Sequence, residues 1–367
     1  NGLSSFIKLL DESGQLIIIK EKVSADQEIA EFSDRIMKSD CGGKAILFEN
    51  TGTDFPVLIN SMGSSERINK VFGENLPESV FTDMFDLAKK LSDSGKSIKM
   101  FSKLWSERSL LKVFPKTIKS KAKCQQNVLK EPDISKLPVL KSWPFDGGAF
   151  FTLPLVFTKH PQTENRNIGM YRMQVFDKQT TGMHWHRHKG GAEHYAEYKK
   201  AGLKMPVAVA LGGDPLLTYL ATAPLPEGID ELLMYGLIRR KPAKMVRCIT
   251  QDIEVPADAD IVLEGYIDPE EELRTEGPFG DHTGFYSLED KFPVFHITAI
   301  THKNDAVYPA TIVGIPPMED LYLGEATERL FKPAIKTAIA PELLDFHLPA
   351  EGVAHNLVLL KVRNRFP

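Results

Sequence analysis

Three short segments of the chain gather residues whose types and spacing could perform chemistry. In the first, Asn167 and Arg172 lie five positions apart around Gly169. An asparagine oxygen can ligate a hard cation, and a guanidinium can bind a carboxylate through two hydrogen bonds. An Asn-x-Gly turn before a strand is also a common structural feature, so this segment alone fits a purely structural role.

The second segment concentrates histidine. His184, His186 and His188 alternate with Trp185 and Arg187. Successive side chains of a β-strand point to opposite faces, so a strand here would place the three imidazoles on one face. That arrangement is consistent with metal ligation or with contacts to a phosphate-bearing ring cofactor. It is equally consistent with the polar lining of a barrel or with an exposed strand.

The third segment, residues 274–284, contains two carboxylates. Glu276 and Asp281 are separated by a Gly-Pro pair and a further glycine, so a constrained turn could fold both acids toward one pocket. Paired acids whose pKa values are shifted serve as acid–base catalysts. The alternative is a glycine-rich hairpin whose acids face water. Elsewhere, Glu231 stands near a predicted helix start, where an acid more often complements the helix dipole than binds a metal.

The elements that would position these residues change in character along the chain. Residues 1–112 alternate helical and strand patterns, which predicts a small α/β domain. Residues 113–315 predict an antiparallel β-rich domain, a barrel, with a helix near Asp230–Arg239. Residues 316–367 predict a helix over 323–340 and a strand over 355–362. The apolar runs of the central domain are 155–158, 171–176, 207–211, 245–249, 261–263 and 294–300.

Composition limits the classes of partner. The formal charge of -4 gives no general electrostatic reason to bind nucleic acid, whose affinity depends largely on neutralising phosphates. Three widely separated cysteines form neither a disulfide framework nor a zinc-ligand pair, which favours a reducing compartment. No leader pattern or membrane-length apolar run is visible, so a cytoplasmic protein is expected. A hydrophobic substrate could still bring it to a membrane periphery.

Taken together, the three segments resemble the UbiD family of reversible decarboxylases. Both five-residue spacings, between Asn167 and Arg172 and between Glu276 and Asp281, match the family's active-site pattern, and the resemblance covers essentially the whole chain. The motifs follow the family's order and are Trp143-Pro-Phe-Asp146-Gly147-Gly148, Asn167 to Arg172, His188-Lys-Gly-Gly191, Pro256-Ala, Ile261-Val-Leu-Glu-Gly265 and Glu276-Gly-Pro-Phe-Gly-Asp281.

The resemblance implies a mixed α/β (α+β) fold in three parts. Residues 1–112 would form the N-terminal α/β domain. Residues 113–315 would form a split β-barrel resembling the FMN-binding folds of flavin reductases, which binds the cofactor. Residues 316–367 would form a connecting helix and the start of a C-terminal α/β domain, most of which we expect to be missing.

The resemblance also implies roles for individual residues. Asn167, His188 and Glu231 look like ligands of a divalent cation, with manganese expected, which bridges to the phosphate of prenylated flavin mononucleotide; potassium is a further cation to consider. His184 and His186 compete with His188 for the metal role. The family's catalytic set is matched by Arg172, Glu276 and Asp281. The residues similar to the flavin-lining segments are Met170, Tyr171, Arg172, His184, Trp185, His186, Lys189 and Gly190.

The implied activity is decarboxylation of an aromatic or unsaturated acid, with the flavin as electron sink and Asp281, or a linked Glu276, as proton donor. An aspartate at position 281 agrees better with quinone-pathway and hydroxyarene members than with the phenylacrylic-acid branch, which favours a ring acid such as a polyprenyl-hydroxybenzoate. A flavin prenyltransferase would supply the cofactor, and a homo-oligomer, a dimer or hexamer, is expected. Two alternatives stay open: a metal-dependent hydrolase or oxygenase built on the histidine row without flavin, and a flavin-binding protein without catalysis.

Overall fold

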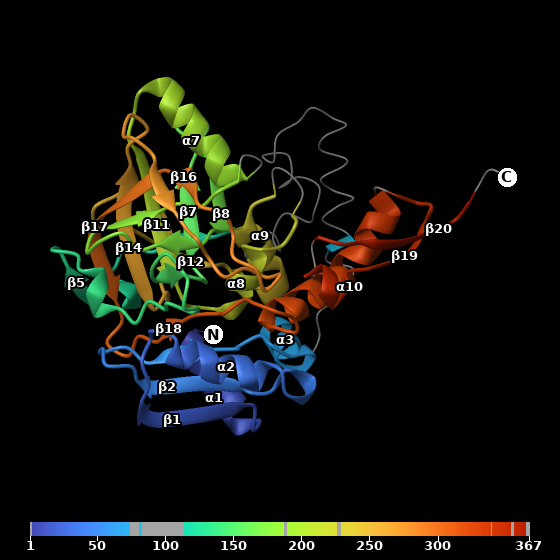
Figure 1. The fold of residues 1–367 in the computed structure, drawn as a ribbon. Helices are drawn as coiled ribbons and strands as arrows, with labels where there is room; N and C mark the ends of the chain where they lie inside the picture. Colours follow the sequence, from blue (N-terminus) through green and yellow to red (C-terminus); the bar gives the residue numbers. More distant parts are fainter. Residues whose placement is uncertain are drawn as a thin grey trace.

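A computed structural model of the chain describes residues 2–73, 81–82, 113–186, 189–225, 229–338, 340–353 and 356–364. Its lower layer in Figure 1 is a four-stranded sheet of order β1-β2-β3-β18 with α1 and α2 beside it. The strands β1 and β2 are parallel, β3 is antiparallel to β2, and β18 is parallel to β3. The bounds are α1 Leu3–Glu12, β1 Leu16–Lys22, α2 Glu28–Met37, β2 Ala45–Asn50, β3 Val57–Ile59, α3 Ser65–Phe72 and β18 Tyr308–Pro309.

The two long helices of this layer pack on opposite faces of its sheet. Alternate residues of a strand face opposite sides. Ile46 and Phe48 of β2 share a buried cluster with Ile29 of α2, whereas Leu47 lies against the cluster of Leu3 of α1. The fourth strand, β18, comes from more than two hundred positions downstream of β3, so the chain returns to this sheet after building the central one.

The central layer is a seven-stranded antiparallel sheet of order β10-β17-β14-β11-β7-β8, with β5 paired to β17 (Figure 1). Strands β11 and β14 are almost wholly buried on both faces. Within the described residues the strand order does not close, so the expected split barrel is not confirmed. The bounds are β5 Asn127–Leu129, β7 Leu155–Lys159, β8 Arg166–Met170, β10 Thr180–Gly182, β11 Met205–Leu211, β14 Ile261–Ile267 and β17 Val294–His302.

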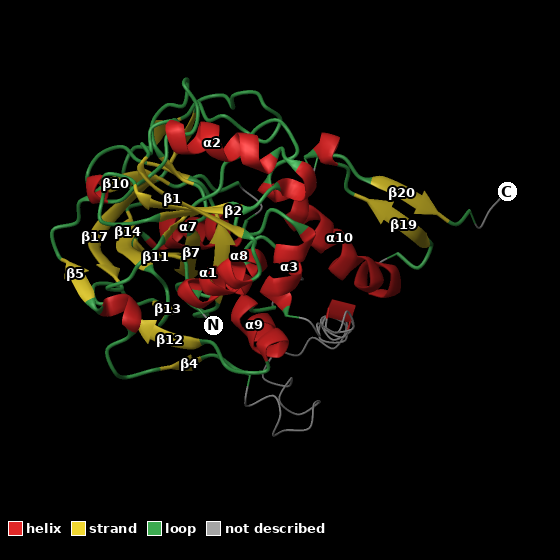
Figure 2. Cartoon of the chain, turned by 90° about the horizontal axis from the view of Figure 1, so that it is seen from below, coloured by secondary structure: helices red, strands yellow, loops and turns green. Residues whose placement is uncertain are grey.

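Several smaller sheets and helices surround this layer (Figure 2). Strands β13, β12 and β4 form one sheet, β15 and β16 a second, and β6 and β9 a third. The bounds are β4 Lys116–Thr117, β6 Phe150–Phe151, β9 Met173–Gln174, α7 Gly190–Ala201, α8 Pro215–Leu220, α9 Glu231–Arg239, β12 Lys244–Arg247, β13 Glu254–Pro256, β15 Arg274–Glu276 and β16 Asp290–Phe292.

Three local expectations need correction. The strand predicted over 171–176 is reduced to β9, Met173–Gln174, because the chain leaves the sheet after β8. Residues 183–186 are not a strand, although Trp185 is buried and His186 is exposed. The helices α7 and α8 were missed. In α7 only a weak apolar stripe marks the buried face, and two glycines open the helix.

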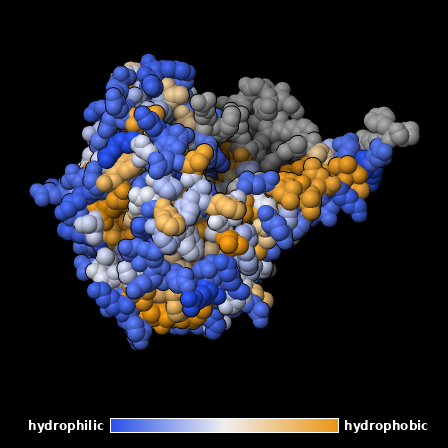
Figure 3. All heavy atoms as spheres, in the orientation of Figure 1, coloured by the Kyte–Doolittle hydropathy of each residue, from blue (hydrophilic) through white to orange (hydrophobic). Residues whose placement is uncertain are grey.

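The C-terminal part consists of α10, Glu319–Ala338, and the hairpin of β19, Leu343–His347, with β20, Leu359–Val362. Both extend away from the central sheet (Figure 1). The hairpin carries hydrophobic surface (Figure 3), and its residues Leu359, Leu360 and Val362 are each more than half exposed.

Two further findings bear on the expected environment. Across the described ranges, no helix is both long enough and apolar enough to cross a membrane. The three cysteines are free, and Cys124 and Cys248 are buried.

Candidate functional site

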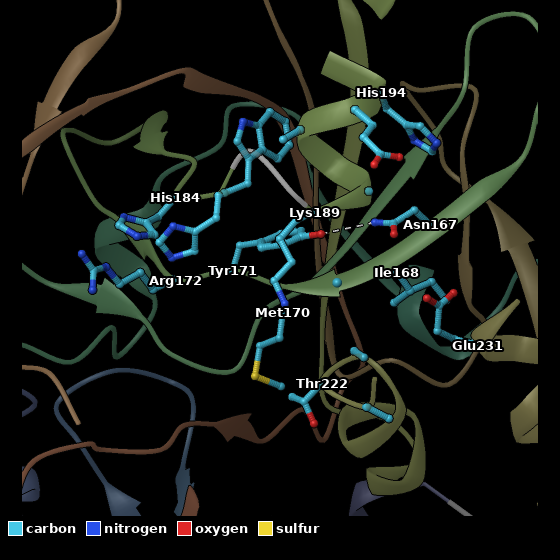
Figure 4. A pocket seen from close by; sticks show the side chains of 18 of the residues that line it. Asn167, Ile168, Met170, Tyr171, Arg172, His184, Lys189, His194, Thr222 and Glu231 are labelled. Carbon is cyan, nitrogen blue, oxygen red and sulfur yellow. Dashed lines mark hydrogen bonds between the residues drawn. The ribbon is translucent and has the colours of Figure 1, made fainter. Parts of the chain in front are cut away.

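A cavity of about 2740 Å³ opens between the central sheet, the start of α7 and the start of α10. Strand β8 and the residues directly after it run along its wall. In Figure 4, Arg172 and His184 lie on one side, and Asn167, Glu231 and His194 lie on the other. We call the group of Arg172, Glu276 and Asp281 the ion-pair end, and the group of Asn167, His194 and Glu231 the desolvated end.

Arg172 holds the ion-pair end together. Its Nε lies 3.0 Å from Glu276 Oε1, its Nη1 lies 3.4 Å from Asp281 Oδ2, and its Nη2 lies 3.2 Å from Ser287 Oγ. The guanidinium also lies over the ring of Phe279, 4.6 Å from its centroid. These four contacts fix the guanidinium, which holds the carboxylates of Glu276 and Asp281 close together. Arg172 and Glu276 are 104 positions apart in the sequence.

The two acids differ in access. The side chain of Glu276 is completely buried and does not line the cavity, whereas the side chain of Asp281 is one-third exposed and does. Oxygen Oε2 of Glu276 has no hydrogen-bond partner among the described residues. Asp281 can therefore exchange protons with the cavity directly, and Glu276 can act only through its neighbours.

The motif around Trp143 supports the loop that carries these acids. Asp146 Oδ1 accepts a hydrogen bond from Gly280 N at 2.7 Å, and its Oδ2 accepts bonds from Ser142 N and Trp143 N. A side chain at Gly280 would place its Cβ 2.1 Å from the Trp143 ring, so only glycine allows the loop to approach so closely. This motif therefore has a structural role in aligning Asp281.

The two described histidines of the second segment have separate environments. His184 Nδ1 lies 2.8 Å from Glu276 Oε1, so this imidazole belongs to the ion-pair end. The His186 ring lies edge-on to the His184 ring at 5.1 Å between centroids. Burial, followed by the charges of His184 and Lys189, lowers the pKa of His186. The prediction for His188 lies outside the described residues.

The desolvated end contains two oxygen donors of the kind that a hard cation prefers. Asn167 Nδ2 donates to Tyr171 Oη at 3.4 Å, and the Asn167 Oδ1 faces the start of α7, where a Cβ on Gly190 would lie 2.2 Å from it. Glu231 accepts a hydrogen bond from the backbone of Ile168, the neighbour of Asn167, and burial raises the pKa of Glu231 to about 8. An amide oxygen and a carboxylate fit manganese or magnesium.

No group of three or more His, Cys, Asp or Glu side chains suited to a metal occurs in the part of the chain that the structure describes. Asparagine is not among those residue types. The predicted ligand set is thus represented by Asn167 and Glu231, and the metal role of the row of three histidines stays a prediction, since His188 lies outside the described residues. His184 is instead directed to a carboxylate.

His194 extends the desolvated end. Its Nδ1 lies 2.8 Å from the hydroxyl of Thr158, the residue that pairs with Asn167 across β7 and β8. Burial, with His160 nearby, lowers the pKa of His194 to about 4. Sequence reasoning did not single out this residue because a lone histidine in a helix carries no motif.

The start of α7 offers a place for an anion. Lys189 is the N-cap, and Gly190 and Gly191 form the first turn. Free backbone N–H groups and the helix dipole favour a phosphate at such a terminus. The two aromatic residues of the predicted flavin lining, Tyr171 and Trp185, are in edge contact at 6.2 Å and are both largely buried.

The same cavity wall contains residues that sequence reasoning missed. Ser287 contacts Arg172 without any motif to reveal it. His282 follows Asp281 directly and contacts Asp320 of α10, which only the folded chain brings near. All three line the cavity.

Comparison with known proteins shows the family of the chain. Residues 116–316 match the 3-octaprenyl-4-hydroxybenzoate carboxy-lyase Rift-related domain, residues 7–87 the N-terminal domain, and residues 321–367 the C-terminal domain of the same family. The chain belongs to the UbiD family. Because the C-terminal domain is also represented, the expectation that the chain lacks most of it is not borne out.

Relatives within the UbiD family are similar over the whole chain. A protein of Aquifex aeolicus is 45% identical across 100% of the chain and 75% of that protein, and one of Archaeoglobus fulgidus is 44% identical across 100% and 74%. A Helicobacter pylori protein is 42% identical across 99% of the chain and 60% of its own length. These three relatives are uncharacterized.

Solved UbiD-class structures share the fold. The evolved dimeric form of HmfF from Pelotomaculum thermopropionicum, solved with prFMN, is 23% identical with a TM-score of 0.82, covering 100% of this chain and 79% of that one. The closed form of vanillic acid decarboxylase from Sedimentibacter hydroxybenzoicus is 25% identical with a TM-score of 0.82, covering 100% and 75%.

Proposed function

We propose that this chain is a carboxy-lyase that removes carbon dioxide from an aromatic or unsaturated carboxylic acid with the help of prenylated flavin mononucleotide. The observation that carries the proposal is the arrangement of Arg172 between Glu276 and Asp281 at the wall of a large cavity, in a UbiD family member. Binding alone requires no acid positioned to deliver a proton, so this arrangement favours catalysis over cofactor storage.

The exposure of the two acids assigns them different parts. Loss of carbon dioxide leaves an electron pair on carbon, which must take up one proton. Asp281 reaches the cavity and can supply that proton, whereas the buried Glu276 positions Arg172 and His184. Arg172 keeps one face toward the cavity, where its guanidinium can orient the substrate carboxylate.

The cavity also suits the proposed cofactor. The flavin, when bound, supplies an electron sink for the electrons released with carbon dioxide. Its phosphate would lie at the start of α7 near Lys189 and Gly190, and its rings along Met170 and Tyr171 and along 184–186. Asn167 and Glu231, with His188, would hold a divalent cation, manganese in our proposal, beside the phosphate; potassium remains part of the proposal as a second cation.

We propose a ring acid as the substrate class, with polyprenyl-hydroxybenzoates and other quinone-pathway acids as the candidates to test first. The solved relative from Sedimentibacter is a vanillic acid decarboxylase, which supports a hydroxylated aromatic acid. The proposal includes a flavin prenyltransferase as cofactor supplier and a homo-oligomeric assembly; a solved relative exists in an evolved dimeric form. The proposal also keeps the expected division of the chain into three domains, residues 1–112, 113–315 and 316–367.

The hydrolase or oxygenase alternative is less well supported. It needs the three histidines on one face of a strand, but residues 183–186 are not a strand and His184 contacts Glu276. A flavin-binding protein without catalysis is a second candidate, which only turnover excludes.

The deciding experiment measures carbon dioxide release from a panel of hydroxyaryl and polyprenyl-hydroxybenzoate acids, using protein produced with a flavin prenyltransferase and manganese. We expect cofactor-dependent release that falls about 10²- to 10⁴-fold in Asp281→Asn, the range of general acid–base catalysis, and also falls in Glu276→Gln. Asp305→Asn, which changes an exposed acid outside the cavity lining, is the matched control. No turnover of any acid despite bound prenylated flavin would overturn the proposal.

A further inference from the structure

His282 connects the proposed proton donor to the first turn of α10. Its Nδ1 lies 2.5 Å from Asp320 Oδ2, and its Nε2 lies 3.6 Å from Asp281 Oδ1. Its backbone N–H also donates to Asp281 Oδ1 at 2.8 Å. One imidazole therefore stands between two carboxylates. Asp281 belongs to residues 276–282, which we call the catalytic loop, and Asp320 belongs to the following part of the chain.

The carboxylate on the far side of His282 is itself fixed. Asp320 Oδ1 accepts from Leu321 N at 2.9 Å, within the first turn of α10. The preceding residue, Glu319, is buried and accepts a hydrogen bond from Met62 N at 2.6 Å. Two successive acids thus attach the start of α10 to both the N-terminal layer and the catalytic loop.

The charges around His282 favour its protonated form. Burial by itself would lower the pKa of His282, but the hydrogen bond and charge of Asp320, with a further contribution from Asp281, outweigh it, and the net shift is upward; Arg172 opposes this shift. Of the two carboxylate contacts of His282, the one with Asp320 is the shorter.

We propose that His282, held by Asp320, is a positioning residue that sets the orientation of Asp281. This inference rests on the proposed function, in which Asp281 is the proton donor. It adds a requirement that the ion-pair end alone does not contain: the first turn of α10 must be in place for Asp281 to have its working environment.

The first test is independent of turnover. The pKa of His282 is measured by NMR titration of the histidine ring signals in the full chain, with His282→Gln used to assign the resonance. In Asp320→Asn we expect that pKa to fall by about one unit or more, since an opposite charge at this distance shifts a pKa by 1 to 3 units. Asp320→Glu should retain most of the upward shift. Asp345→Asn is the control, with no change expected: it removes an acid of β19 that pairs with Lys332 of α10.

The second test uses the enzyme loaded with cofactor. If His282 fixes the geometry of Asp281, Asp320→Asn and His282→Gln should lower kcat for carbon dioxide release by up to about 10²-fold with little change in KM. Asp320→Glu should recover most of that loss, and the flavin spectrum should stay that of the unaltered protein. Thermal melting curves show that each variant is folded.

The outcomes separate the two proposals. An unchanged His282 pKa in folded Asp320→Asn, or an unchanged kcat in the two folded variants, overturns the positioning role and leaves the proposed function standing. The expected NMR shift in a protein that releases no carbon dioxide from any acid overturns the proposed function, while the coupling of His282 to Asp320 stands.

Discussion

The two ends of the cavity handle buried polar groups in opposite ways. At the ion-pair end, Arg172 faces Glu276 and Asp281 directly, so each carboxylate has an opposite charge within a few ångströms. At the desolvated end, burial dominates: it raises the pKa of Glu231 to about 8 and lowers that of His194 to about 4. One stretch of chain, residues 166–172, contributes Arg172 to the first end and Asn167 to the second. The comparison teaches that the first end meets its buried acid with an opposite charge, whereas burial at the second end favours neutral groups.

Breaking the ion-pair end should have the largest effect on stability. Arg172→Met leaves Glu276 buried without its guanidinium, and removing one partner of a buried pair costs about 3 to 5 kcal/mol. We expect the free energy of unfolding, measured by urea denaturation, to fall by an amount at the lower limit of that range, because His184 still contacts Glu276. Arg35→Met, at an exposed pair with Glu31, should cost less than about 1 kcal/mol. Equal losses in the two variants would contradict the comparison.

The second largest effect should be the loss of stability at the desolvated end in acid. The folded state disfavours a charged His194, whereas the unfolded chain protonates it near its ordinary value. The unfolded state therefore binds more protons between pH 6.5 and about 4, and the stability contributed by neutral His194 is lost as the pH falls through that window. The full effect is on the order of 3 kcal/mol. Unfolding curves of the unaltered chain and His194→Gln over this range should converge toward low pH; parallel curves would refute the assignment.

A smaller effect is expected at the helix that presents Glu231. Asp230 is the N-cap of α9, and its side chain accepts a hydrogen bond from Leu232 N at 2.7 Å. Asp230→Ala should lower the free energy of unfolding by about 1 kcal/mol, the usual cost of removing an N-cap. Asp230→Asn keeps a capping oxygen and should lose clearly less. If both variants lose the same amount, the Arg166 ion pair with Asp230 is the dominant contribution instead.

The smallest effect should come from the residue between the two ends. Both hydrogen bonds that Tyr171 Oη accepts, from Asn167 Nδ2 and Gly191 N, are 3.4 Å long. Tyr171→Phe should therefore cost less than about 1 kcal/mol in urea denaturation. A loss of unfolding free energy above that limit would show that the tyrosine bonds are stronger than their lengths indicate. A measurement of manganese binding on the same variant tests whether this hydroxyl positions Asn167.

Much of the organisation could be predicted from the sequence. Short apolar runs predicted β7, β11 and β17, because that pattern is local, and a helix was expected near Asp230–Arg239, where α9 lies. The strand expected at 171–176 was wrong for a physical reason: an apolar run cannot reveal that Arg172 leaves the sheet to meet Glu276. The start of α7 carries too few apolar residues to show its period.

By itself, the sequence determined which residue types are present, their spacing and the family they resemble, because motifs are properties of short segments. Only the tertiary structure decided that His184 contacts Glu276, that Glu276 is closed off while Asp281 reaches the cavity, and that Asp320 meets His282. These contacts join residues 38 to 109 positions apart. Such pairs depend on how whole sheets and helices pack, and burial, which sets the charge states at both ends, exists only after that packing is complete.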